Sequence, residues 1–127
     1  MDKTVLVVED EPSLREMISI ILQDEGFMTY EAENGERAVA LLDEHAVDLV
    51  LSDISMPKMD GLELGLYCKE HFPELPFVLM SGGSRELQNI DEEGYLESGK
   101  EITQARFVLQ KPFDLDAFMK VINECLP

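Results

Sequence analysis

The sequence predicts an α/β fold in which helices cover both faces of a parallel sheet. Short apolar runs alternate along the chain with longer segments whose apolar residues recur at helical spacing. This alternation is typical of parallel strands joined by right-handed helical crossovers, which place helices on both faces of the sheet. At 127 residues the chain is close to the commonest size of one domain, so we expect a single domain over residues 1–127.

The first third of the chain predicts two strands with a helix between them. The apolar run 4–8 forms the first strand, Pro12 stands at a favourable first helical position, and Gly26 ends the helix. Residues 27–32 alternate as a second strand, and their polar members favour the edge of the sheet. The expected buried face of the helix is Leu14, Met17, Ile18, Ile21 and Leu22.

The middle of the chain predicts a helix, a buried strand and another helix. Asn34 is a good cap for a helix that ends near His45. The continuous apolar run that follows ends on Asp53 and is typical of a strand buried on both faces. A third helix stops before Pro73. Its expected inner face is Leu64, Tyr67, Cys68 and Phe72.

The last third predicts two more strands, 77–80 and 107–109, separated by an irregular segment. Glycines and clustered acids interrupt residues 84–106, so we expect the fourth helix to be short, displaced or partly disordered. Asp114 is expected to cap a final helix. The apolar stripe of that helix is Leu115, Phe118, Met119, Ile122, Cys125 and Leu126.

Chemically active side chains follow four of the expected strands. An acidic turn that begins with Glu9 and Asp10 follows the first strand, Asp53 ends the third, Ser81 follows the fourth and Lys111 follows the fifth. Because ligands in open α/β sheets bind outside the carboxyl ends of the strands, we expect these side chains to form one site.

The same positions resemble the receiver domains of two-component response regulators. The shared pattern is an acidic pair after the first strand, a central Asp followed by Met-Pro-x-Met-Asp-Gly, a Ser after the fourth strand and Lys-Pro-Phe after the fifth. In this chain these are residues 9–10, 53–61, 81 and 111–113. The resemblance spans nearly the whole chain, and it implies a flavodoxin-like, doubly wound, five-stranded parallel sheet with strand order 2-1-3-4-5.

The resemblance also implies a function as a phosphoacceptor switch. Asp53 would accept a phosphoryl group from a histidine kinase or a histidine phosphotransfer protein, and Ser81 and Lys111 would contact that group. The altered surface would control a downstream protein or a covalently attached output or kinase domain. Such a domain is not an enzyme beyond weak autophosphorylation from small phosphodonors and autodephosphorylation.

A divalent cation, Mg²⁺ above all, is the expected cofactor. Carboxylates at close quarters repel one another, and a bound cation relieves that repulsion. We expect the ligands to be Glu9, Asp10 and Asp53, completed by water and the backbone carbonyl of Ser55.

At three positions this chain departs from the usual pattern of the receivers that it resembles. Glu9 stands where many receivers carry Asp, which keeps the charge and lengthens the reach. Ser81 precedes a Gly-Gly pair, as in receivers associated with hybrid sensor histidine kinases. Val108 stands three positions before Lys111, where an aromatic switch residue is usual, so no aromatic swing is expected. A cis bond before Pro112 is also implied.

Composition excludes several partners. A net charge of −17 opposes direct binding to nucleic-acid phosphates. No apolar run approaches the roughly 20 residues of a membrane span. Cys68 and Cys125 form no disulfide or metal pattern, which favours packing roles and, with the rest, a cytoplasmic location.

Three alternatives use similar features. A phosphohydrolase of the haloacid dehalogenase type also has a strand-end Asp, but it needs a second acid two residues later, where this chain has Ser55. A flavodoxin-like electron carrier needs a hydroxyl-rich phosphate loop where this chain has acids. A receiver-fold interaction module that is never phosphorylated would keep the fold alone.

Overall fold

The computed structural model describes residues 2–54, 56, 58–81, 103 and 105–127. Its five strands form one parallel sheet in the order β2-β1-β3-β4-β5, which confirms the predicted topology. The strands are β1 (Thr4–Val8), β2 (Met28–Ala32), β3 (Leu49–Asp53), β4 (Phe77–Ser81) and β5 (Phe107–Gln110). The expected irregular fourth helix falls on residues 84–106, nearly all of which lie outside the described residues.

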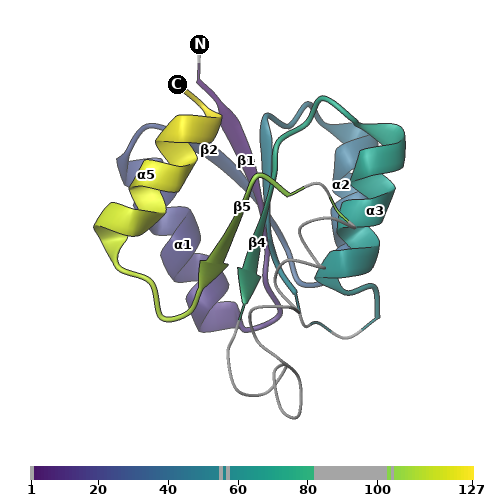
Figure 1. Cartoon of the computed structure of the whole chain (residues 1–127), viewed down its shortest axis with the longest axis horizontal. Helices are drawn as coiled ribbons and strands as arrows, with labels where there is room; N and C mark the ends of the chain where they lie inside the picture. The colour runs from purple at the N-terminus through teal and green to yellow at the C-terminus, as the bar shows by residue number, and fades with distance from the viewer. Residues whose placement is uncertain (1, 55, 57, 82–102, 104) are drawn as a thin grey trace.

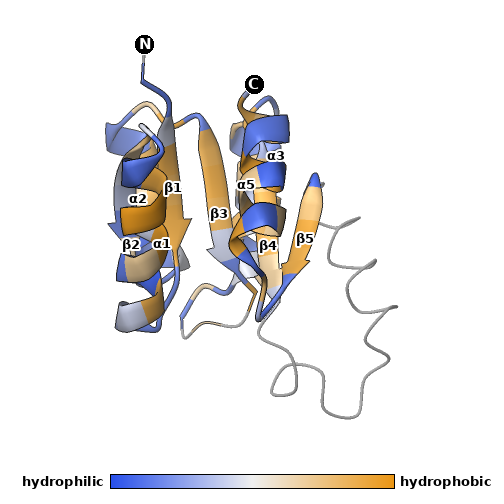
Figure 2. Ribbon diagram, turned by 90° about the vertical axis from the view of Figure 1, so that its left-hand side faces the viewer, coloured by the Kyte–Doolittle hydropathy of each residue, from blue (hydrophilic) through white to orange (hydrophobic). Residues whose placement is uncertain are grey.

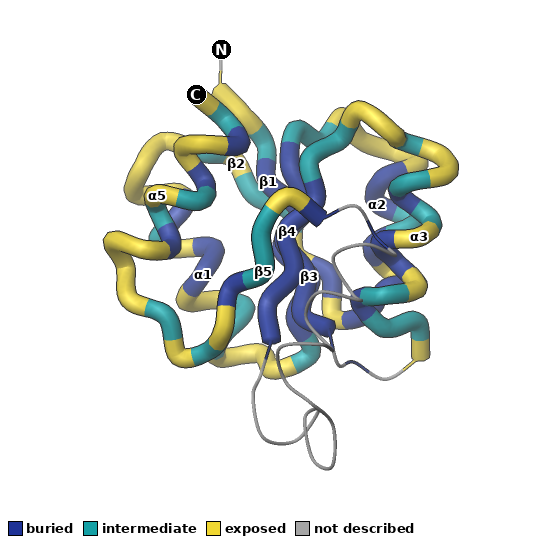
Figure 3. The backbone as a smooth tube through the Cα atoms, viewed as in Figure 1, coloured by how far each residue is buried: buried dark blue, intermediate teal, exposed yellow. Residues whose placement is uncertain are grey.

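Helices cover both faces of the sheet. In Figure 1, α1 (Pro12–Asp24) and α5 (Leu115–Cys125) lie on one side, and α2 (Gly35–Glu44) and α3 (Gly61–His71) lie on the other. The central strands β1, β3 and β4 are almost wholly buried and apolar, whereas the outer helix surfaces are exposed (Figures 2 and 3). Alternate strand residues therefore pack into two separate cores, one under each pair of helices.

Local chain signals explain where the helices begin. Glu11 precedes Pro12 and caps α1, since its carboxylate accepts hydrogen bonds from the N–H groups of Ser13 and Leu14. Asn34 caps α2 and Asp114 caps α5, as predicted. Gly26 has φ +96°, a left-handed conformation that suits glycine after the end of α1.

The predicted buried faces of α1 and α5 are each wrong at one residue. Met17 is 50% exposed and Leu115 is 54% exposed, although both stand in apolar positions of their helices. On α3, Tyr67 is half-buried and packs against the core as predicted, and Gly65 is a further buried residue of the inner face. A Cβ atom on Gly65 would come within 2.4 Å of Cγ2 of Thr103, so this glycine makes room for the buried threonine.

Both cysteines are free and buried, in agreement with packing roles. Burial raises the pKa of the Cys68 thiol to about 12. Among the described helices, none has the length and apolar character needed to span a membrane.

Candidate functional site

The register of the sheet brings the predicted site residues to one edge. Val8 of β1 pairs with Ser52 of β3, and Asp53 pairs with Met80 of β4. Ser81 pairs with the last residue of β5, directly before Lys111. The acids, the hydroxyl and the ammonium therefore leave neighbouring strands at nearly the same level, as the sequence predicted.

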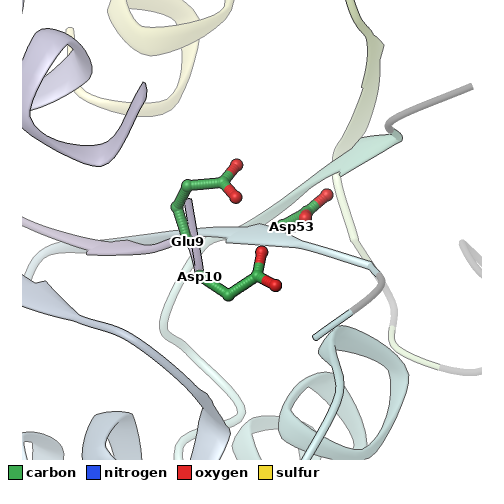
Figure 4. Close-up of side chains that lie close together, drawn as sticks. All are labelled: Glu9, Asp10 and Asp53. Atoms are coloured by element: carbon green, nitrogen blue, oxygen red, sulfur yellow. The ribbon is translucent and has the colours of Figure 1, made fainter. Parts of the chain in front are cut away.

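Three carboxylates form the centre of this edge. Carboxylate oxygens of Glu9, Asp10 and Asp53 lie within 4.8 Å of one another, and Figure 4 shows the three groups gathered around a common space. Glu9 and Asp53 are buried, at 1% and 2% exposure, whereas Asp10 is partly exposed. The set offers only oxygen ligands, which suit a hard divalent cation such as Mg²⁺.

Lys111 lies against the carboxylates. Its Nζ is 2.6 Å from Oε1 of Glu9 and 3.2 Å from Oδ1 of Asp53. Burial would lower the pKa of Lys111, but the hydrogen bond to Glu9 and the charge of Asp53 outweigh it and raise the pKa. With the three acids and Lys111 ionised, the group carries two net negative charges, which a divalent cation would neutralise.

Hydrogen bonds hold both the carboxylate and the backbone carbonyl of Glu9 in place. Its Oε1 accepts from Lys111, and its Oε2 accepts from the Glu11 N–H at 3.1 Å. Nη1 of Arg15 also donates to the Glu9 carbonyl at 2.8 Å. Burial raises the pKa of Glu9 even though Lys111 opposes the shift. The Glu9 side chain, which is longer than the Asp of many receivers, thus reaches Lys111. A metal cation would have to compete with the Lys111 ammonium for Oε1 of Glu9.

Ser81 places a hydroxyl group in the interior at the end of β4. The residue is fully buried, and its Oγ has no hydrogen-bond partner among the described residues. The Lys111 N–H donates to the Ser81 carbonyl at 2.8 Å, so the two residues are tied together through the backbone. A buried hydroxyl without a partner is costly, and a phosphoryl oxygen would supply the missing acceptor.

The loop after Asp53 turns sharply back toward the strand. The Gly61 N–H donates to the Ile54 carbonyl at 2.8 Å, and a Cβ atom on Gly61 would lie 2.2 Å from the Asp53 carbonyl oxygen. Only glycine permits this approach, which explains the Gly at the end of the Met-Pro-x-Met-Asp-Gly motif. Ser55, whose carbonyl was expected to bind the cation, lies outside the described residues.

The peptide bond between Lys111 and Pro112 is cis, as the resemblance implied. The sequence did not single out Arg15 or Gly35, which also contact the loops of this site. Arg15 looks like an ordinary polar residue of α1, and the position of Gly35 after a capping Asn suggests only a helix start.

A family model for the response regulator receiver domain matches residues 5–123. The chain belongs to this family. Receivers are generally non-enzymatic signalling domains that interact with histidine kinases and output domains, and they bind Mg²⁺ through acidic residues. The carboxylate cluster of this receiver fits that role.

Individual relatives agree with the family assignment. The receiver is 34% identical to the chemotaxis protein CheY of Bacillus subtilis over 127 residues, which cover 99% of each chain. It is 37% identical over 110 residues to the autoinducer 1 sensor kinase/phosphatase LuxN of Vibrio harveyi; this match covers 84% of the receiver and 13% of LuxN. The structure of TrrA from Thermotoga maritima in complex with Mg²⁺-BeF superposes with a TM-score of 0.81 at 28% identity, covering 98% of this receiver and 99% of TrrA.

Asp10 and Glu11 provide a matched test of the acidic turn. Asp10→Asn should weaken Mg²⁺ binding by about tenfold or more, because it removes a charged oxygen from the cluster. Glu11→Gln should change Mg²⁺ binding little, since Glu11 caps α1 and is not part of the carboxylate cluster. Titration calorimetry of both variants measures the contrast, and equal losses would mean that the acidic turn has been assigned wrongly.

Proposed function

We propose that Asp53 accepts a phosphoryl group from a histidine kinase or a histidine phosphotransfer protein in a Mg²⁺-dependent reaction. The observation that carries this proposal is the placement of the Asp53 carboxylate. It is buried at the end of β3, beside the Lys111 ammonium and within the acidic cluster. Glu9 and Asp10 belong to the turn after β1, whereas Asp53 is itself the last residue of its strand, β3.

The chemistry follows from these neighbours. A carboxylate oxygen of Asp53 attacks phosphorus, the bond to the donor breaks, and an acyl phosphate forms. Such transfers depend mainly on positioning and on neutralising the charge of the phosphoryl oxygens. The Lys111 ammonium supplies one positive charge, and the Ser81 hydroxyl donates a hydrogen bond to a phosphoryl oxygen.

Mg²⁺ is the cation that we assign to the cluster. Glu9, Asp10 and Asp53 would hold it together with the backbone carbonyl of Ser55, and the bound ion would neutralise charge on the phosphoryl group. The two net negative charges of the site and its oxygen ligands support this assignment. The complex of the related TrrA with Mg²⁺-BeF supports it as well.

The altered surface would control a partner protein or a covalently attached output or kinase domain. The match to part of LuxN supports attachment in a hybrid kinase, and the match to full-length CheY supports a stand-alone protein. We place this function in the cytoplasm, because free cysteines such as Cys68 and Cys125 suit a reducing compartment. The net charge of −17 argues against direct contact with nucleic acid.

Removal of the metal should abolish phosphorylation. With acetyl phosphate as donor, the protein should gain one phosphoryl group in millimolar Mg²⁺ and none in excess EDTA, because the negative site then repels the donor. Intact-protein mass spectrometry measures the gain. Equal uptake in EDTA would contradict the metal-dependent mechanism. If the protein takes up no phosphoryl group from acetyl phosphate in either condition and none from a histidine kinase, the result would favour a receiver-fold interaction module that is never phosphorylated.

A further inference from the structure

The connection between β2 and α2, residues 32–35, bonds both to the acidic turn that begins with Glu9 and to the loop that follows Asp53. At one end, the Ala32 carbonyl accepts from the Glu9 N–H at 3.0 Å. At the other end, the Gly35 N–H donates to the Met59 carbonyl at 2.9 Å. Glu9 begins the acidic turn, and Met59 lies in the loop between β3 and α3 that follows Asp53. One short connection therefore spans the two loops.

The contact with Met59 requires glycine at position 35. A Cβ atom there would lie 2.5 Å from the Met59 carbonyl oxygen and 2.6 Å from the Met59 Cβ, closer than real Cβ atoms approach. The φ angle of Gly35 is outside the left-handed region, so the backbone conformation alone would accept other residues. Alanine would also favour the first turn of α2 more than glycine does. Position 35 thus requires glycine because the β3–α3 loop approaches it too closely to leave room for a side chain.

The β3–α3 loop is held at two points. Its ends are joined by the hydrogen bond from the Gly61 N–H to the Ile54 carbonyl, and Gly35 holds it at Met59. Lys58, next to Met59, has φ +61°, an uncommon conformation for a residue with a side chain. The Met59 side chain is half-buried against the core under α2 and α3. The hydrogen bond from Gly35 therefore fixes one point of a β3–α3 loop whose backbone includes a residue with positive φ.

We propose that Gly35 is a positioning residue for the Mg²⁺ site, because it sets the distance between the acidic turn and the loop that follows Asp53. This inference rests on the proposed function of that site. A side chain at position 35 pushes Met59 outward, and the displaced loop shifts Asp53, from which it starts, relative to Glu9 and Asp10. Metal affinity depends on such placement, since a ligand set must be held close to its bound geometry.

Gly35→Ala tests the proposal, and Gly26→Ala is its control. Both variants should unfold at lower denaturant concentration than the parent protein. At position 26 the cause is backbone strain at φ +96° with no atom within 4 Å of the new Cβ. Under conditions in which both are folded by circular dichroism, only Gly35→Ala should lose Mg²⁺ affinity, by about tenfold. Unchanged affinity in Gly35→Ala, or the same loss in Gly26→Ala, would overturn the proposal.

Hydrogen exchange of the parent protein tests the same link if Gly35→Ala does not fold. The Gly35 amide should exchange slowly, and saturating Mg²⁺ should slow it several-fold further, because the cation stabilises the loop to which this amide is bonded. The Met28 amide bonds to the Lys3 carbonyl at the opposite end of the sheet and should not respond. If Mg²⁺ binds but does not change the exchange rate of the Gly35 amide, the inference is overturned. If the parent protein binds no Mg²⁺, the proposed function itself is overturned.

Discussion

Asp53→Asn should abolish phosphorylation of this protein. An amide oxygen is a poor nucleophile, and the exchange also removes one of the three negative charges that would bind the cation. The side chain keeps its size, so the buried end of β3 should stay packed. Incorporation of label from a radioactive phosphodonor in the presence of Mg²⁺ measures the loss, which should reach background.

Asp48→Asn is the matched control for this experiment. Asp48 lies just before β3, at the opposite end from Asp53, and its Oδ2 accepts from the Thr4 N–H at 2.8 Å. Its replacement changes the same charge on the same part of the chain without touching the site, so labelling should continue at the parent rate. Labelling of Asp53→Asn at the level of Asp48→Asn would refute the assignment of the phosphoacceptor.

Lys111→Ala should have opposite effects on metal binding and on phosphorylation. Without the ammonium, the Glu9 and Asp53 carboxylates stay buried and unneutralised, which should cost about 3–5 kcal/mol of folding free energy in the absence of metal. Mg²⁺ should then bind more tightly, because the competing cation at Oε1 of Glu9 is gone. Phosphorylation should slow by about a hundredfold or more, since a charge directed at the phosphoryl oxygens is missing.

Denaturant unfolding with and without Mg²⁺ separates these effects. Mg²⁺ should restore more stability to Lys111→Ala than it adds to the parent protein, and exposed Lys120→Ala should behave as the parent does. If Lys111→Ala keeps parent stability without metal and is phosphorylated at the parent rate, Lys111 has no role in this site.

Local signals made most of the fold predictable from sequence. Strand ends, helix caps and the order of chemically active residues depend on neighbours within a few positions, as Asn34 and Asp114 illustrate. The strand order came from the family pattern, and the structure confirms it. Apolar periodicity was less exact, because Met17 and Leu115 occupy core-like positions in their helices yet remain half exposed.

Contacts between distant parts of the chain were not predictable in this way. Glu9 and Lys111 are 102 residues apart, and nothing in either segment indicates that the longer acid would reach the ammonium. Gly35 and Met59 meet only because α2 and the β3–α3 loop pack on the same face of the sheet. Such contacts depend on the three-dimensional packing of elements, while sequence patterns record mainly local geometry.

The position of the phosphoryl group is the most direct test of the whole account. After incubation with acetyl phosphate and Mg²⁺, the acyl phosphate can be trapped by reduction, and peptide mass spectrometry can then locate the modified residue. We predict one modified carboxylate, Asp53, with Glu9 and Asp10 unmodified. Modification at Glu9 or Asp10 instead, with Asp53 intact, would contradict the account.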